Sequence, residues 1–248
     1  MSGSPTWLTG PDRFNAFMIG AHALTQLLSH VLIWATVDGL DRSLPRRGPL
    51  IVAANHASAL DPVLVTGYLA PAIRRPLHWM GKQELAAHPI LGWVLRSYGG
   101  FAVRRGAADT DAFRTAKAVL DAGRVLAVFP EGTRSRDGAL QRAKPGLALL
   151  AVRSGAPILP VGVGGMDRFL PRHTKIPRPF KRVSLRFGEP FTVEAPPGRD
   201  RHEALERATT EIMARIGRLL PERQWGAYAE EIRALAGAGS PAVVLREG

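Results

Sequence analysis

The sequence Leu50-Ile51-Val52-Ala53-Ala54-Asn55-His56-Ala57-Ser58-Ala59-Leu60-Asp61-Pro62 joins an uninterrupted apolar run to a polar turn. The apolar run predicts a buried strand, and residues 62–69 are typical of a helix that starts after the turn. In one continuous helix, His56 and Asp61 would point about 140° apart, at about 100° per residue, whereas a turn can fold Asp61 back onto His56. An imidazole oriented by a carboxylate can act as a general base toward a hydroxyl group.

The same turn also has a purely structural interpretation. Asp61 before Pro62 is a favourable N-cap, and Ser58 with Asp61 three residues later is similar to a capping box. This stretch by itself leaves both interpretations open.

The composition limits the classes of function. With 248 residues and 46% hydrophobic content, the chain can bury the core of one large domain or two small ones. The absence of cysteine excludes disulfides and thiol catalysis, and the seven histidines show no paired ligand spacing, so we expect no metal. The net charge is +12, and 5 of the 33 basic residues are lysine, which leaves 28 arginines. Such a chain is expected to have an anionic partner.

The N-terminal part predicts a membrane-associating helix. Residues 1–12 are expected to be loose, and residues 14–37 contain no Asp, Glu, Lys or Arg. As one helix this stretch would span roughly 36 Å, enough to cross a bilayer. Its uncharged polar side chains gather on one side of the helical wheel: Asn15, His22, Thr25, Gln26, Ser29, His30 and Thr36. This pattern favours a helix in the membrane interface, with a helix packed on the domain or a spanning helix as alternatives.

Beyond residue 37, strand and helix patterns alternate. Strands are predicted at residues 76–81, 100–103, 125–129, 158–163 and 183–187. Helices are predicted at residues 90–97, 109–121, 143–153 and 202–219. This alternation predicts an α/β fold with a mixed central sheet flanked by helices on both faces. We expect one domain over residues 38–235, preceded by the membrane-associating segment 1–37 and followed by a flexible tail at 236–248.

Two further motifs follow predicted strands, where open α/β sheets collect their ligands. Residues 99–105, Gly-Gly-Phe-Ala-Val-Arg-Arg, place two guanidinium groups there, and residues 129–135, Phe-Pro-Glu-Gly-Thr-Arg-Ser, place a carboxylate and an arginine in a glycine turn. Glu131 and Arg134 predict either a self-contained ion pair or a phosphate site in which Glu131 holds Arg134 in place.

Together these stretches resemble the glycerolipid acyltransferase family, in particular the bacterial 1-acylglycerol-3-phosphate O-acyltransferases. The NHxSxxD block of that family is matched by Asn55, His56, Ser58 and Asp61. Its GGxxVxR block is matched by Gly99, Gly100, Val103 and Arg105, and its FPEGTRS block in full by residues 129–135. A PIxPV-like strand is matched by Pro157, Ile158, Pro160 and Val161. Order and spacing agree across residues 48–165, with departures in the second block at Phe101, Ala102 and Arg104.

The resemblance implies that His56 is a general base and that Asp61 orients it. It implies an acceptor-phosphate site that includes Arg105, Glu131, Gly132 and Arg134, and we expect substrate binding also to involve Lys82, Arg104 and Thr133. The implied reaction is attack of a glycerol hydroxyl on an acyl thioester, which needs no metal, cofactor or covalent intermediate. The donor would be acyl-CoA or acyl carrier protein.

The leading expectation for the acceptor is 1-acylglycerol-3-phosphate (lysophosphatidic acid), which would become phosphatidic acid in phospholipid biosynthesis. Another lysolipid, such as lyso-ornithine lipid, is an alternative within the enzyme class, as is lipid remodelling. A non-catalytic membrane-binding module is the alternative from another class.

Residues 168–182 mix basic and apolar side chains with several prolines, and they predict either an anionic-membrane contact or a solvated loop. With the segment 14–37, this loop leads us to expect a peripheral or monotopic protein on the cytoplasmic face of the cell membrane. No nucleic-acid motif, no Gly-x-Ser-x-Gly elbow around Ser58 and no complete dinucleotide loop at residues 162–165 is present.

Overall fold

The computed structural model of the chain describes residues 16–40, 44–82, 100–103, 109–174, 176–194 and 201–237. Their strands form one seven-stranded sheet in the order β1-β7-β6-β2-β5-β3-β4. These strands are β1 (Ile33–Asp38), β2 (Leu50–Ala54), β3 (Leu77–Lys82), β4 (Phe101–Val103), β5 (Val125–Val128), β6 (Ile158–Gly164) and β7 (Lys181–Phe187). All neighbours are parallel except β6 and β7. The predicted α/β fold with a mixed central sheet is confirmed.

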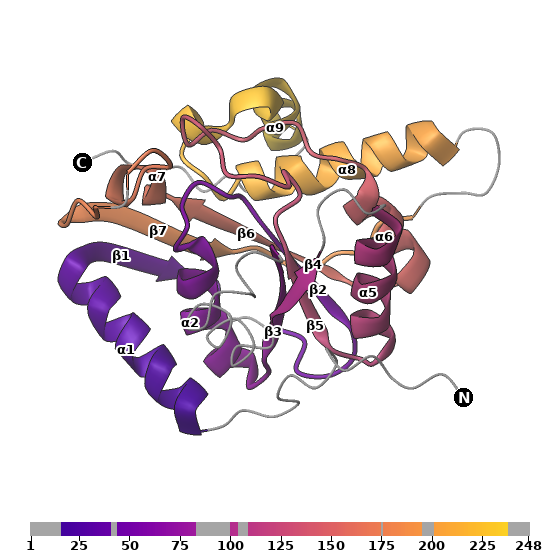
Figure 1. Ribbon diagram of the computed structural model, residues 1–248. Helices are drawn as coiled ribbons and strands as arrows, with labels where there is room; N and C mark the ends of the chain where they lie inside the picture. Colours follow the sequence, from indigo (N-terminus) through magenta and orange to yellow (C-terminus); the bar gives the residue numbers. More distant parts are fainter. Residues whose placement is uncertain are drawn as a thin grey trace.

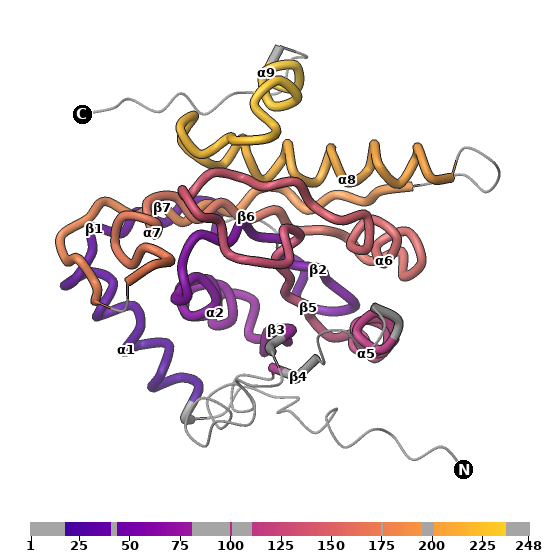
Figure 2. The backbone as a smooth tube through the Cα atoms, turned by 45° about the horizontal axis from the view of Figure 1, so that its top comes forward, coloured from indigo at the N-terminus to yellow at the C-terminus, as the bar shows by residue number. Residues whose placement is uncertain are grey.

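Helices cover both faces of this sheet (Figure 1). One face carries α1 (Ala16–Leu32), α2 (Asp61–Ile73) and the short α7 (Met166–Phe169). The other face carries α5 (Asp109–Asp121), α6 (Gly146–Ser154) and α8 (Arg201–Gly217). The helix α9 (Ala229–Gly237) packs on α8 after two short 3-10 turns, Glu222–Gln224 and Gly226–Tyr228. Figure 2 shows α8 and α2 on opposite sides of the strands.

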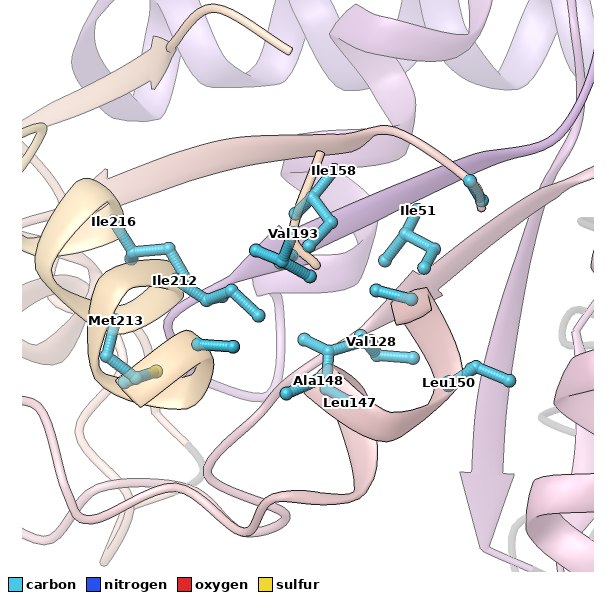
Figure 3. Close-up of a cluster of buried hydrophobic side chains, with 14 of the residues drawn as sticks. Ile51, Val128, Leu147, Ala148, Leu150, Ile158, Val193, Ile212, Met213 and Ile216 are labelled. Atoms are coloured by element: carbon cyan, nitrogen blue, oxygen red, sulfur yellow. The ribbon is translucent and has the colours of Figure 1, made fainter. Parts of the chain in front are cut away.

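The central strand β2 explains why two cores form. All five of its residues are buried. Successive side chains of a strand point to opposite faces. Ile51 and Ala53 accordingly join the core with α6 and α8, whereas Leu50, Val52 and Ala54 join the core with α2. Figure 3 shows Ile51 in the first of these cores. A parallel strand buried on both faces has little freedom to shift, so the residues that follow Ala54 start from a fixed position.

The segment 14–37 is not one helix, in contrast to the prediction. The helix α1 ends at Leu32, and Ile33–Asp38 continues directly as the edge strand β1, paired in parallel with β7. Its β-branched and aromatic residues favour a strand once a partner edge is available. Among the described residues, no helix is both long and apolar enough to cross a bilayer.

The part of the polar stripe formed by Thr25, Gln26 and Ser29 faces α2, whereas His30 is exposed. The side-chain amide of Gln26 donates to the Gly67 carbonyl at 2.9 Å, and Ser29 Oγ lies 2.6 Å from the Tyr68 hydroxyl. A Cβ at Gly67 would lie 2.6 Å from Thr25 Cγ2, so glycine permits the close approach of α1 and α2. The opposite side is apolar and 44–60% exposed; this outer face comprises Ile19, Leu24, Leu27, Leu28, Val31 and, on β1, Trp34.

Other predicted boundaries differ less. Helix α6 begins at Gly146, later than the predicted residue 143, because Pro145 disfavours a helical conformation at the residue before it. The predicted helix at residues 90–97 lies outside the described residues, as do the predicted loose segment 1–12 and residues 238–248 of the predicted tail.

Candidate active site

The turn after β2 brings His56 and Asp61 together. Asp61 begins α2, and its Oδ2 lies 2.9 Å from His56 Nδ1. Because a carboxylate only accepts hydrogen bonds, His56 Nδ1 carries the proton and Nε2 is left as the basic nitrogen. The His56 side chain is 16% exposed, whereas that of Asp61 is fully buried. This is the geometry of an imidazole base oriented by a carboxylate.

Asp61 also organises the turn itself, so the catalytic and the structural interpretation describe the same side chain. Its Oδ2 accepts the backbone N–H groups of Ala57 at 2.8 Å and Ser58 at 2.7 Å. Burial raises the pKa of Asp61, while the hydrogen bond and charge of His56 and the two N–H groups act in the opposite direction. The carboxylate therefore fixes both the imidazole and the backbone that carries it.

An aromatic ring packs against one face of the imidazole. The rings of His56 and Phe129 are stacked with their centroids 3.8 Å apart and their planes at 7°. Phe129 in turn lies 4.7 Å from the ring of Trp79, whose Nε1 donates to Thr66 Oγ1 at 2.8 Å. Since Asp61 and Phe129 restrain two directions of movement, His56 Nε2 is presented in one orientation.

Glu131 is buried beside this dyad and has different hydrogen-bond partners from the one predicted. Its Oε1 accepts the His56 backbone N–H at 2.8 Å, and its Oε2 accepts the Gln141 backbone N–H at 3.0 Å. Burial raises the pKa of Glu131 to about 7, against the effect of these N–H groups. The prediction that Glu131 holds Arg134 is wrong, because in the described part of the chain both oxygens bind His56 and Gln141 instead.

The glycine turn after β5 lies against the His56 turn. Gly132 has a φ of +69°, a backbone conformation that favours glycine. Ser135 N–H donates to the His56 carbonyl at 2.7 Å, and the Arg134 carbonyl accepts a hydrogen bond from the Arg172 guanidinium. Thr133, between them, is exposed. Two of the predicted motif segments, residues 55–61 and 129–135, thus meet at one edge of the sheet, and Arg172 of the loop at residues 168–182 contacts the second.

The remaining predicted site residues are less fully described. Lys82 ends β3, which neighbours β5 on the same edge, but only its backbone is described. Arg104 and Arg105 follow β4 and lie outside the described residues. The parallel order β2-β5-β3-β4 places the ends of these strands along one edge.

The structural roles of several supporting residues were not predicted from the sequence. The Asn55 side chain donates to the Val163 carbonyl and accepts the Val163 N–H, which fastens the end of β2 to β6. Ser58 Oγ donates to the Leu170 carbonyl at 3.1 Å, so this serine is engaged structurally. Asn55 and Phe129 lie within the motifs, a signal that could have found them, whereas Gln141 carries no such signal.

Known proteins with a similar sequence or fold are acyltransferases. The sequence profile of the acyltransferase family matches residues 36–164, which include the dyad and the glycine turn. In the crystal structure of the 1-acyl-sn-glycerophosphate (LPA) acyltransferase PlsC from Thermotoga maritima, 76% of the chain superposes on 79% of this one. The TM-score is 0.61 and the sequence identity 26%.

Curated relatives match over shorter stretches. A lyso-ornithine lipid O-acyltransferase from Pseudomonas aeruginosa is 34% identical over 47% of this chain and 43% of its own length. A 1-acyl-sn-glycerol-3-phosphate acyltransferase from Borreliella burgdorferi is 31% identical over 51% of this chain and 50% of its own. The chain thus spans about half the length of these curated relatives. The family match over half of its residues and the geometry around His56 lead to one conclusion: the chain belongs to the acyltransferase family.

Proposed function

We propose that this protein transfers a fatty acyl group from an acyl thioester to the free hydroxyl of a lysophospholipid. The observation that carries the proposal is the His56–Asp61 pair, with Nδ1 bound to a buried carboxylate and a side chain that is 16% exposed. Family membership supports the acyl-transfer chemistry.

The dyad can perform this chemistry without a covalent enzyme intermediate. His56 Nε2 takes the proton of the acceptor hydroxyl as its oxygen attacks the thioester carbonyl carbon. The resulting imidazolium is stabilised by the Asp61 carboxylate. When the tetrahedral intermediate collapses, the C–S bond breaks, and the departing sulfur takes the proton back from His56. The products are the ester and a free thiol.

The acceptor phosphate is proposed to bind on the side of His56 formed by β5, β3 and β4. Arg134, with the backbone of Gly132 and Thr133, offers a guanidinium and N–H groups. Lys82, Arg104 and Arg105 follow or end the neighbouring strands and would complete the site. Glu131 acts in this proposal as a positioning residue, because its carboxylate binds the His56 backbone.

Lysophosphatidic acid is the proposed acceptor, and phosphatidic acid the product. A second acceptor, lyso-ornithine lipid, is favoured by the 34% identity to an acyltransferase of that name. It offers an amino-acid head group in place of a phosphate, so the two acceptors demand different contacts.

The test measures thiol release from a long-chain acyl-CoA in detergent micelles with each acceptor in turn. We expect release that depends on lysophosphatidic acid. Release that depends only on lyso-ornithine lipid would transfer the proposal to that acceptor. If neither acceptor nor a panel of other lysolipids supported release, with acyl carrier protein tried as the second donor, the proposal would fail in favour of a non-catalytic membrane-binding module.

We also propose that the protein binds the cytoplasmic face of the cell membrane peripherally or monotopically. The outer face of α1 supports this, since an exposed apolar patch of this kind is typical of an interaction site. Phe180, 61% exposed, lies beside it, because its N–H donates to the Leu32 carbonyl at 2.7 Å. Ile176 is 76% exposed, and Arg178 and Lys181 supply positive charge for anionic lipids.

Replacing Leu24, Leu27 and Val31 together with serine is expected to lower binding to anionic liposomes roughly 100-fold. Each half-exposed side chain would contribute about 1 kcal/mol on transfer to the lipid, and about 1.4 kcal/mol corresponds to a factor of ten. Sedimentation with vesicles measures the bound fraction. Turnover in detergent micelles is the control for folding, and unchanged liposome binding by a variant that still turns over would contradict this membrane contact.

A further inference from the structure

Gln224 is a buried polar residue far along the chain from the catalytic motifs. It ends the 3-10 turn Glu222–Gln224, and its exposed fraction is 0%. The sequence profile of the acyltransferase family matches residues 36–164, so the family match does not include Gln224. Burying a polar side chain is unfavourable unless its hydrogen bonds are satisfied. The partners of Gln224 therefore indicate its role.

The side-chain amide of Gln224 joins two segments. Its Nε2 donates to the Gly138 carbonyl at 2.8 Å, and its Oε1 accepts the Gly165 N–H at 3.1 Å. The Gln224 backbone carbonyl also accepts the Leu140 N–H at 2.9 Å. Gly138 and Leu140 belong to residues 138–143, which we call the support loop, whereas Gly165 directly follows β6. Gln224 thus ties the support loop to the end of β6.

The end of β6 is a fixed point for this contact. All seven residues of β6 are buried, and the strand pairs with both β2 and β7. Near its end, Val163 exchanges hydrogen bonds of 3.0 and 2.7 Å with the side chain of Asn55, the residue before His56. The end of β6 and the start of the catalytic turn are therefore held together.

The support loop in turn reaches the His56 backbone through Glu131. The Gln141 N–H donates to Glu131 Oε2 at 3.0 Å, and Glu131 Oε1 accepts the His56 N–H at 2.8 Å. Because Glu131 is buried, the loss of an N–H donor to its carboxylate is unfavourable. A displacement of the support loop is therefore expected to move Glu131 and, with it, the backbone that carries the imidazole.

Tyr228 fixes the other end of the support loop. Its hydroxyl accepts the Ala143 N–H at 2.9 Å, and its ring is buried in the core with α6 and α8. Between Gln224 and Tyr228, Gly226 permits a close approach to the loop, since a Cβ there would lie 2.3 Å from the Leu140 carbonyl oxygen. The two side chains and this glycine therefore hold the support loop along its length.

We propose that Gln224 and Tyr228 are positioning residues, which hold the His56 backbone in place through the support loop and Glu131. The inference rests on the proposed acyl-transfer function. A base that must take a proton as the hydroxyl attacks tolerates little displacement, since an error of about 1 Å can lower a rate roughly 100-fold. Both side chains are buried and do not contact a substrate, so their loss should change kcat and not KM.

The first variant is Gln224→Met, which keeps the length of the side chain but not its hydrogen bonds. In detergent micelles, we expect kcat for acyl transfer to fall about tenfold, because the imidazole is kept but placed less exactly. The KM values for acyl-CoA and lysophosphatidic acid should stay unchanged. The second variant, Tyr228→Phe, removes a single hydroxyl and keeps the buried ring, so it should fold even if Gln224→Met does not. Its kcat should fall about threefold.

A double-mutant cycle separates positioning from a general loss of stability. Glu131→Gln removes the carboxylate through which the support loop holds His56. If Gln224 and Tyr228 act through Glu131, adding either substitution to Glu131→Gln should lower kcat by less than about twofold further. Losses of kcat that multiply independently would overturn the inference.

The matched control is Thr209→Val on α8. It also removes a hydrogen bond of a buried side chain, from Thr209 Oγ1 to the Leu205 carbonyl at 2.7 Å, but this bond lies within one helix. Thermal unfolding measures the stability that each variant loses. Thr209→Val should keep the wild-type kcat, and a fall in kcat equal to that of the two test variants would overturn the inference.

Hydrogen exchange of the His56 amide tests the inference without turnover. Relative to the amides of β7, it should be faster in Gln224→Met and Tyr228→Phe and unchanged in Thr209→Val. This result would support the hold on His56 even if no acceptor were turned over. If the wild type transfers acyl groups and both test variants keep its kcat, the inference is overturned and the proposed function stands.

Discussion

Replacing His56 with alanine is expected to lower kcat for acyl transfer roughly 1,000-fold. A general base contributes about 10²- to 10⁴-fold, and alanine provides no group that can take the hydroxyl proton. The side chain is 16% exposed and is not part of either hydrophobic core, so the folded state should be retained. The measurement is thiol release from a long-chain acyl-CoA with and without lysophosphatidic acid in detergent micelles.

The matched control for this variant is His202→Ala, since the His202 side chain is 81% exposed on α8. It should keep wild-type turnover. Both variants should bind anionic liposomes as the wild type does. Acceptor-dependent release that survives His56→Ala within a factor of about ten, below the smallest contribution expected of a general base, would exclude His56 as the base.

Replacing Asp61 with asparagine is expected to lower kcat by on the order of 1,000-fold, with little change in the KM for either substrate. Asparagine keeps the shape of the side chain but lacks the charge that stabilises the imidazolium. If its amide nitrogen faces His56 Nδ1, it also reverses the tautomer and places the proton on Nε2. Because the Asp61 side chain is fully buried, it cannot contact a substrate. The effect should therefore appear in kcat.

Steady-state kinetics with varied acyl-CoA and varied lysolipid separate kcat from the two KM values. Asp121→Asn is the control, because Asp121 is an exposed partner of Lys117 at the end of α5. A Michaelis constant that rises while kcat is kept would show that Asp61 acts only by shaping the turn. Thermal unfolding measures how much stability the variant loses when the hydrogen bonds from His56 Nδ1 and from the Ala57 and Ser58 N–H groups to Asp61 Oδ2 are changed.

The centre of the site could be predicted because its parts follow buried parallel strands. Such strands end at the same edge of a sheet, so motifs that are distant in sequence meet there. The pairing of His56 with Asp61 also follows from local geometry, since only a turn can close five residues of chain onto one another. The structure confirms the fold that carried this reasoning.

The role of Glu131 could not be predicted, because its partners are the backbone N–H groups of His56 and Gln141. A backbone donor leaves no mark on the sequence, whereas Arg134 stands three residues away and suggests an ion pair. Glu131 is buried against the backbone of two other segments, and these segments come together only in the tertiary structure.

The N-terminal segment shows a different limit. Its helical pattern reveals two faces but does not say which one meets the protein, and here Gly67 and Tyr68 of α2 select the polar one. The change from helix to strand at Ile33 is also decided elsewhere in the chain, because β1 forms by pairing with β7.

The pairing of β1 with β7 has a consequence for the order of events during synthesis. Ile33 lies opposite Lys181, so β1 leaves the ribosome long before its partner strand exists. Non-local pairing of this kind is completed late in folding. The nascent chain therefore presents the outer face of α1 while that edge of the sheet is still open. If the nascent chain binds a bilayer at this stage, α1 would bind first, and the rest of the domain would then fold beside a helix that is already bound.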